Sequence, residues 1–281
     1  MEIFKTRTGI KSYLDERKTS LKVGFVPTMG ALHEGHISLI EAAKKNADIT
    51  VCSIFVNPTQ FNDPKDLAKY PRPIEQDIAM LESAGCDVLF LPSVEEIYPN
   101  THEEWHIDLG QLDQIWEGKH RPGHFQGVTQ VVNKLFQIVQ PDTAYFGQKD
   151  FQQIMVIQKM VDVKNLPVQI IICPIIRDKD GLALSSRNVR LSPEGKKKAL
   201  VISKTLRAVE ADFTTKKLPE LNKSGKHLIQ GEPDVLLEYF AICETRTLAE
   251  ATTIENNKQY VALAAAWVEG VRLIDNMLMN V

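Results

Sequence analysis

The sequence lacks several features that mark secreted and membrane-bound proteins. It has only four cysteines, which are far apart and form no Cys-x-x-Cys pair: Cys52, Cys86, Cys173 and Cys243. Their position in apolar, strand-like runs favours buried free thiols over disulfides or metal ligands. No stretch is long and apolar enough to span a bilayer, and residues 1–18 contain no apolar segment of the signal-peptide kind. We therefore expect a cytoplasmic protein that is not inserted in a membrane.

An excess of charge of one sign is also missing. Charged residues make up 25% of the chain, and the formal net charge is −3. A near-neutral balance makes nucleic acid a poor candidate partner, whereas small anionic ligands could still bind local basic clusters. The length of 281 residues and the hydrophobic content of 43% are enough for one large domain or two modest ones. Internal repeats and low-complexity tracts are absent.

The first part of the chain alternates between two kinds of segment. Short apolar runs typical of buried strands occupy residues 22–28, 49–56, 86–92, 143–147 and 168–176. Segments with apolar residues at helical spacing lie between them, at residues 35–48, 73–85, 124–139 and 150–165. Strands separated by helices of this length predict a doubly wound, Rossmann-like parallel α/β sheet. Such sheets bind ligands beyond the carboxyl ends of their strands.

The pattern changes near Ile175. A lysine-rich helical stretch from Ser192 toward Phe213 is followed by two strand-rich runs at 235–243 and 260–278. Hairpin-like strands beside helices predict a second, smaller α+β domain. We therefore place a Rossmann-like domain at residues 1–175 and the smaller domain at residues 176–281.

The stretch PTMGALHEGH, residues 27–36, follows the first predicted strand and allows three interpretations. A zinc-protease motif needs histidines four apart on one helix face, whereas His33 and His36 are three apart and Gly35 interrupts the helix. An ordinary turn explains the glycines but gives no reason for two histidines. A phosphate site explains both, because a helix N-terminus presents backbone N–H groups to an anion and the histidines add donors.

The sequence HEGH resembles the H-x-G-H signature of nucleotidylyltransferases and class I aminoacyl-tRNA synthetases. It is followed in order by SIFVNPTQF, YPRPIEQD, RPGHFQGV, FGQKDFQQ and DGLALSSRN. Together, from Val23 to Leu191, these segments resemble the pantothenate synthetase (pantoate–β-alanine ligase) family. The resemblance implies ATP-dependent ligation of (R)-pantoate and β-alanine to pantothenate, in coenzyme A biosynthesis. The reaction passes through pantoyl adenylate and releases AMP and pyrophosphate. The family also implies Mg²⁺ with the ATP and a homodimer.

The resemblance implies a set of ATP-binding residues in three segments. They are Met29, Gly30, Ala31, Leu32, His33, Glu34, Gly35 and His36; Gly147, Gln148, Lys149 and Asp150; and Ile176, Leu184, Ser185, Ser186 and Arg187. Catalysis is expected of His36, His33, Lys149 and Arg187. Since negative charge grows on the phosphates, histidine, lysine and arginine donors suit this role. The family often has glutamate at position 148 and usually methionine at position 184.

Other residues match the acceptor side of the family's site. Pantoate is expected to contact Gln60, Gln153 and Arg121, and β-alanine to contact Gln60. His124 matches a family residue that lines the site. Phe55, Val56 and Phe61 could form the apolar wall of the pantoate pocket. For Phe55, a place in the hydrophobic core is an equally good interpretation. Asp77 matches an acidic position near the metal.

Two alternatives remain on sequence grounds. One is an H-x-G-H enzyme that transfers a nucleotide to a phosphate or an alcohol, which would need no amine site. The other is a nucleotide-binding regulatory module without turnover, which would not need both histidines together with Lys149 and Arg187. The position of the third ATP segment at the domain boundary further leads us to expect that the smaller domain closes over ATP.

Overall fold

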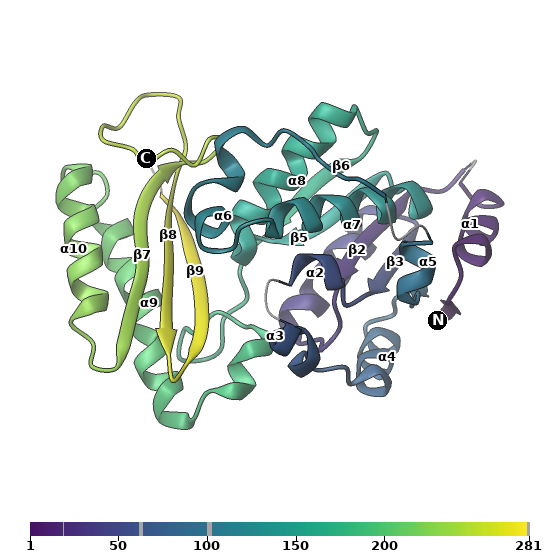
Figure 1. The fold of residues 1–281 in the computed structure, drawn as a ribbon, viewed down its shortest axis with the longest axis horizontal. Helices are drawn as coiled ribbons and strands as arrows, with labels where there is room; N and C mark the ends of the chain where they lie inside the picture. Colours follow the sequence, from purple (N-terminus) through teal and green to yellow (C-terminus); the bar gives the residue numbers. More distant parts are fainter. Residues whose placement is uncertain (19, 62–63, 100–102, 280–281) are drawn as a thin grey trace. The chain divides into compact units, whose positions relative to one another are not determined.

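The computed structural model describes residues 1–18, 20–61, 64–99 and 103–279 of the chain (Figure 1). They form two compact units. The first comprises Met1–Gly147 and Gln152–Pro174, and the second comprises Gln148–Phe151 and Ile175–Val281. The short segment 148–151 thus belongs to the second unit although it lies within the sequence of the first.

The first unit contains a parallel sheet with the strand order β1-β4-β3-β2-β5-β6. Its strands are β1 (Glu2–Phe4), β2 (Val23–Thr28), β3 (Ile49–Ile54), β4 (Val88–Phe90), β5 (Thr143–Gly147) and β6 (Gln169–Cys173). Its helices are α1 (Arg7–Asp15), α2 (Glu34–Asn46), η1 (Pro58–Gln60), α3 (Pro64–Lys69), α4 (Ile74–Ser83), α5 (Val94–Ile97), η2 (Gly110–Asp113), α6 (Trp116–His120), α7 (His124–Val139) and α8 (Phe151–Lys164). The predicted doubly wound fold class is confirmed.

Both faces of this sheet are covered. Val26 packs with α2 and α4 residues such as Ile40 and Leu81. Its neighbour Phe25 points to the opposite face, where its ring meets that of Phe136 on α7. Burial on both faces explains why the strands read as continuous apolar runs. The strand order reverses at β2, which lies between β3 and β5, and ligands bind at the carboxyl ends of strands at such a reversal.

The second unit is built on an antiparallel sheet in the order β7-β8-β9. Its elements are η3 (Gln148–Asp150), η4 (Ser186–Arg190), α9 (Pro193–Ala211), α10 (Leu218–Gln230), β7 (Val235–Glu244), β8 (Tyr260–Val268) and β9 (Val271–Met279). A core between the sheet and the two long helices includes Leu206, Leu221, Phe240 and Leu273. The predicted smaller α+β fold is confirmed, and the strand-rich run at 260–278 forms the two strands β8 and β9.

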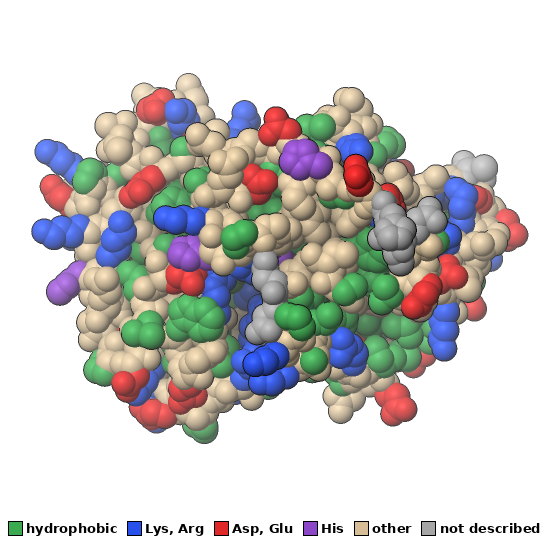
Figure 2. All heavy atoms as spheres, viewed as in Figure 1, with side chains coloured by type: hydrophobic (Ala, Val, Ile, Leu, Met, Phe, Trp, Pro, Cys, Tyr) green, Lys and Arg blue, Asp and Glu red, His purple; other side chains and the backbone are tan. Residues whose placement is uncertain are grey.

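The helix α7 begins and ends where its apolar spacing predicts. Gly123 precedes it with a φ of 79°, and Gln140 ends it with a φ of 47°. In contrast, β1, α1 and α10 were not predicted, although the buried Leu218, Leu221 and Ile229 of α10 lie on one helix face. The three residues of β1 are too few for such a pattern to be recognised. In the region of α10, Figure 2 shows basic and acidic side chains interspersed on the surface.

All four cysteines are free and buried. In the part of the chain that the structure describes, no helix combines the length and the hydropathy needed to cross a membrane.

Candidate active site

The PTMGALHEGH stretch forms a strained turn between β2 and α2. Gly30 and Ala31 both have left-handed backbones, with φ values of 78° and 51°. This conformation is natural for glycine but costs free energy for alanine, so the surroundings must hold Ala31 in place. The turn leads directly into α2, whose first two residues are Glu34 and Gly35.

A buried carboxylate holds this turn. The two oxygens of Asp77, which is 1% exposed, accept hydrogen bonds from the backbone nitrogens of Ala31 at 2.9 Å and Leu32 at 2.7 Å. A Cβ atom at Gly30 would lie 2.9 Å from the same carboxylate, so a side chain there would disturb it. Burial raises the pKa of Asp77, and the hydrogen bonds from the Leu32 and Ala31 backbone N–H groups partly oppose that rise. Asp77 therefore fixes the backbone that carries the histidines.

The assignment of Asp77 to magnesium stays a prediction. Its two carboxylate oxygens already accept backbone amides, and the described residues include no group of three or more histidine, cysteine or acidic side chains that could hold a metal ion. The described residues thus include no preformed set of protein ligands for Mg²⁺.

His33 and His36 are both oriented by backbone hydrogen bonds. His33 caps α2, with its Nδ1 accepting the Gly35 N–H at 3.1 Å. The Nδ1 of His36 accepts the N–H of His33 at 3.3 Å, and the two ring centroids are 4.1 Å apart. Because a backbone N–H can only donate, each neutral ring carries its hydrogen on Nε2. The turn thus holds two imidazoles as Nε2–H donors at the N-terminus of a helix.

Gln60 ends η1 and is 9% exposed. Its Oε1 accepts a hydrogen bond from Asn57 Nδ2 at 3.2 Å, and its Nε2 lies 2.9 Å from the sulfur of Met29. Asn57 is held in turn, since its Oδ1 accepts from the Tyr98 hydroxyl at 2.8 Å. Burial raises the pKa of Tyr98 to about 12, so this hydroxyl remains a donor. The orientation of the Gln60 amide is therefore set by its neighbours.

Gln60 is also connected to the start of α7. One ring nitrogen of His124, Nε2, lies 2.9 Å from the guanidinium of Arg121, and the other, Nδ1, lies 2.9 Å from the Gln60 carbonyl. Arginine only donates, so Nε2 accepts and Nδ1–H donates to the carbonyl. Behind them, a Cβ at Gly127 would lie 2.4 Å from the carbonyl oxygen of Thr59. Gln60 is thus brought together with His124, which lies 64 positions further along the chain, and with Arg121 next to it.

The remaining acceptor-side residues of the first unit differ in exposure. Phe55 is 5% exposed and belongs to the core, whereas Val56 and Phe61 are half-buried. Gln153 is half-buried on α8. Its neighbour Gln152 is 3% exposed and holds the segment from Leu112 to Glu117 in place. Its Oε1 accepts the Glu117 N–H, and its Nε2 donates to the carbonyls of Leu112 and Ile115. Of the two adjacent glutamines, the structure gives Gln152 the structural task.

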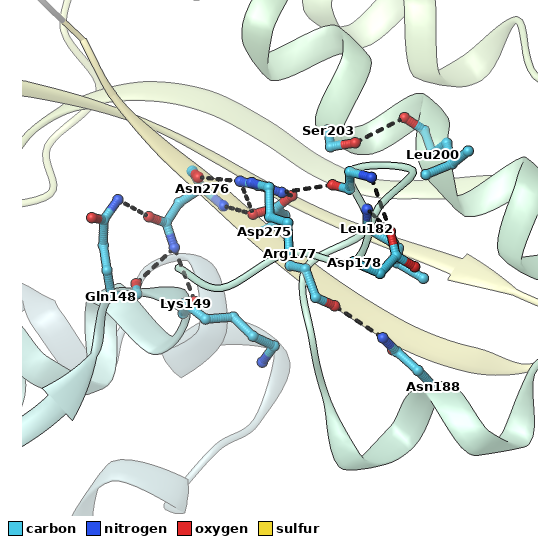
Figure 3. Close-up of polar contacts among 12 residues, drawn as sticks. Gln148, Lys149, Arg177, Asp178, Leu182, Asn188, Leu200, Ser203, Asp275 and Asn276 are labelled. Carbon is cyan, nitrogen blue, oxygen red and sulfur yellow. Dashed lines mark hydrogen bonds and ion pairs between the residues drawn. The ribbon is translucent and has the colours of Figure 1, made fainter. Parts of the chain in front are cut away.

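Gly147 ends β5, and η3 follows with Gln148, Lys149 and Asp150 (Figure 3). The ammonium of Lys149 lies 3.4 Å from the Asp150 carboxylate, and the lysine side chain is 18% exposed. The backbone carbonyls of Gln148 and Lys149 both accept hydrogen bonds from Asn276 Nδ2, at 2.9 Å each. In the second unit, the Lys149 turn is therefore attached to β9.

The loop that leads to Arg187 is also anchored on β9. Arg177 forms a bidentate ion pair with Asp275, at 2.6 and 2.9 Å. The Ile176 carbonyl accepts the Leu184 N–H at 3.0 Å. Ser185 caps η4, with its Oγ accepting a hydrogen bond from the backbone N–H of Arg187 at 3.3 Å. Ser186, the first residue of η4, lies between them.

Sequence reasoning missed three polar residues that organise these segments: Asn57, Asp275 and Asn276. A signal was present for Asp275, because β9 places it on the same face as the core residues Val271 and Leu273. A carboxylate at such a position requires a partner. The partner could not be read from the chain, since Arg177 is 98 residues away.

Comparison with known proteins gives a consistent picture. Residues 2–278 match the family described as Pantoate-beta-alanine ligase. The pantothenate synthetase of Cytophaga hutchinsonii is 49% identical over 94% of each chain, and that of Acetivibrio thermocellus is 45% identical over the full length of both.

Solved structures agree with this. A pantothenate synthetase from Thermus thermophilus is 40% identical and covers 99% of each chain with a TM-score of 0.91. A pantoate-beta-alanine ligase from Francisella tularensis, complexed with beta-gamma ATP and beta-alanine, is also 40% identical. It covers 99% of this chain and 97% of its own, with a TM-score of 0.81. The chain therefore belongs to the pantoate-beta-alanine ligase family.

Proposed function

We propose that this protein is a carbon–nitrogen ligase that joins (R)-pantoate and β-alanine to form pantothenate, with cleavage of ATP to AMP and pyrophosphate. The observation that carries the proposal is the match of residues 2–278 to the ligase family. The Francisella relative, which is complexed with beta-gamma ATP and beta-alanine, supports the choice of substrates.

The reaction proceeds in two balanced steps. A carboxylate oxygen of pantoate attacks the α-phosphorus of ATP, and the bond to the bridging oxygen breaks, so that pyrophosphate leaves with that electron pair. The amine of β-alanine then attacks the acyl carbon of pantoyl adenylate, AMP leaves with the electron pair of the acyl–oxygen bond, and the amine loses a proton. The protein's contribution to the first step is positioning and stabilisation of phosphate charge.

His33 and His36 are the proposed donors to the phosphates. Their Nδ1 atoms accept backbone N–H groups, so their Nε2–H groups are the ones that can face a ligand. A neutral imidazole with its hydrogen on Nε2 donates there and does not act as a base. We therefore assign His36 hydrogen bonding to the growing negative charge and no proton abstraction through Nε2.

The second unit supplies the remaining phosphate contacts in this proposal. Lys149 contributes a point charge, and Arg187, with Ser185 and Ser186, binds the β- and γ-phosphates. Arginine suits the last task because its fork meets phosphate oxygens in pairs. The other ATP contacts are the backbone and side chains of the three segments given above.

Pantoate is assigned to Gln60, Gln153 and Arg121, and β-alanine to Gln60. A neutral amide can bind hydroxyls and a carboxylate without neutralising the nucleophile. The fixed orientation of the Gln60 amide fits a selective binding role, because a preoriented donor loses little entropy on binding.

Mg²⁺, the homodimer and a cytoplasmic location belong to the same proposal. When bound, Mg²⁺ would neutralise phosphate charge, with ATP oxygens and water as most of its ligands. The homodimer rests on the family and is tested by sedimentation of the purified protein. Free, buried cysteines suit a reducing compartment.

An assay of AMP release with each substrate omitted in turn tests this function. We expect AMP release to require both pantoate and β-alanine, and pyrophosphate release to require pantoate and ATP alone. Pyrophosphate release that needs a phosphate or an alcohol, with AMP transferred to that acceptor and none set free, would indicate the other transferase class. ATP binding without turnover would indicate a regulatory module.

A further inference from the structure

Asn276 directs its side-chain hydrogen bonds to two residues that lie far away in the sequence. It is 2% exposed. Its Nδ2 donates to the carbonyls of Gln148 and Lys149, and its Oδ1 accepts from Gln148 Nε2 at 3.1 Å. Figure 3 shows the Lys149 side chain pointing away from this cluster. Asn276 thus binds the backbone of η3, and the Lys149 side chain takes no part in these hydrogen bonds.

Asn276 is itself held firmly. It is paired with Leu263 in the sheet, and its own N–H donates to Asp275 Oδ1 at 2.8 Å. Arg177 holds Asp275 with two hydrogen bonds and reaches the Asn276 carbonyl at 3.4 Å. The buried Arg177–Asp275 ion pair is well suited to fix one geometry, because separating the two side chains would leave a buried charge without its partner. Asn276 therefore connects η3 to a rigid base.

We propose that Asn276 is a positioning residue for pantoyl-adenylate formation, which fixes the Lys149 backbone so that the ammonium group meets the ATP phosphates. This inference rests on the proposed function. The element η3 has only three residues, so it has little internal hydrogen bonding of its own. A displacement of about 1 Å at a residue that contacts the reacting group can cost on the order of 100-fold in rate.

The test compares Asn276→Ala and Asn276→Asp with Asn222→Ala. Asn222 is a buried asparagine of the same unit whose Oδ1 accepts the Ile242 N–H at 2.9 Å, so its loss weakens the unit without touching η3. Asn276→Asp keeps the shape but turns an acceptor toward two carbonyl oxygens. Pyrophosphate release from ATP and pantoate, without β-alanine, is measured for each. We expect about a tenfold to hundredfold loss for both Asn276 variants and a much smaller loss for Asn222→Ala.

A double-mutant cycle separates positioning from general destabilisation. If Asn276 acts through Lys149, Asn276→Ala causes no further loss of rate in a Lys149→Ala background. If the two losses multiply, Asn276 acts on something other than the lysine and the inference is wrong.

Hydrogen exchange gives a readout that does not depend on activity. We expect faster amide exchange in peptides covering residues 148–151 for Asn276→Ala or, if that variant does not fold, for Asn276→Asp. Asn222→Ala should leave this exchange unchanged. Unchanged exchange in a folded Asn276 variant would overturn the positioning role. Absence of adenylate formation by the unaltered protein, in contrast, would count against the proposed function.

Discussion

At the residue scale, the two histidines of the α2 turn each have two tasks. Through Nδ1 they satisfy backbone N–H groups at the start of the helix, and through Nε2 they can donate to a ligand. A substitution can therefore remove one task and keep the other. Asparagine can place an oxygen close to the position of Nδ1, but it has no donor where Nε2 lies.

Replacing His36 with asparagine should lower the rate of adenylate formation while leaving the fold intact. Loss of one preorganised donor to transition-state charge typically costs on the order of 100- to 1000-fold. Single-turnover pyrophosphate release and thermal unfolding are measured together. The exposed His227 on α10, changed to alanine, serves as the control and should retain full activity. A folded His36 variant with a near-normal rate would exclude His36 as a phosphate donor.

Replacing Gln60 with alanine should weaken pantoate binding more than ATP binding. The reason is that its amide is oriented by Asn57 next to Met29, within the part of the first unit assigned to pantoate. Calorimetry with each ligand alone provides the measurement. Equal losses for both ligands would mean that Gln60 supports the fold and not the binding of pantoate.

At the element scale, the contact between η1 and α7 depends on a residue with no side chain. Gly127 lets the helix approach the backbone of Thr59 and Gln60, and Asn57 Nδ2 donates to the Gly127 carbonyl at 3.1 Å. Since the opposing atoms belong to the backbone, they cannot rotate away as a side chain could. The position of Gln60 therefore follows from how closely a helix can approach a turn.

Gly127→Ala should destabilise the protein by about 1–3 kcal/mol, the usual cost of overpacking, and raise the KM for pantoate. The KM for ATP should change much less. Thermal unfolding and steady-state kinetics are compared with Gly231→Ala, where the nearest atom to the new Cβ is 3.3 Å away. If both glycine variants behave alike, the close approach of α7 to η1 has no special part in pantoate binding.

Sequence patterns predicted most of the long, periodic elements, but they missed the short strand β1 and also α10, whose apolar residues do follow helical spacing. The span of α7 follows from Val128, Val132 and Phe136 on one face. The edge strand β1 has three residues, two of them exposed, and gives no such pattern. Local periodicity reports which face of an element is buried, but it carries no information on which distant segment does the burying.

At the scale of the whole molecule, the same limit applied to the candidate site. The motifs near His36, Lys149 and Arg187 could be proposed from the sequence, because each is a local pattern. The residues that hold them could not, since Asp77 and Asn276 act across 45 and 127 positions of the chain. Supporting contacts of this kind become visible only once the chain is folded.

The two-step reaction gives a prediction for Arg187 that involves the complete catalytic cycle. Arg187→Ala should slow adenylate formation, because the pyrophosphate moiety loses a bidentate partner. It should affect amide formation less, because pyrophosphate has left by then. Presteady-state rates of each half-reaction, the second started from preformed pantoyl adenylate, provide the measurement. Equal losses in both steps would mean that Arg187 acts on the shared acyl-AMP geometry.

The attachment of η3 to β9 also orders events during synthesis. A ribosome completes residues 148 and 149 long before it reaches Asn276, the residue that binds their carbonyls. Chains emerge N-terminus first and tend to fold domain by domain, so the first unit can form while the Lys149 turn still lacks its partner. A nascent chain that has not yet reached Asn276 therefore lacks the two hydrogen bonds that hold the backbone of the Lys149 turn.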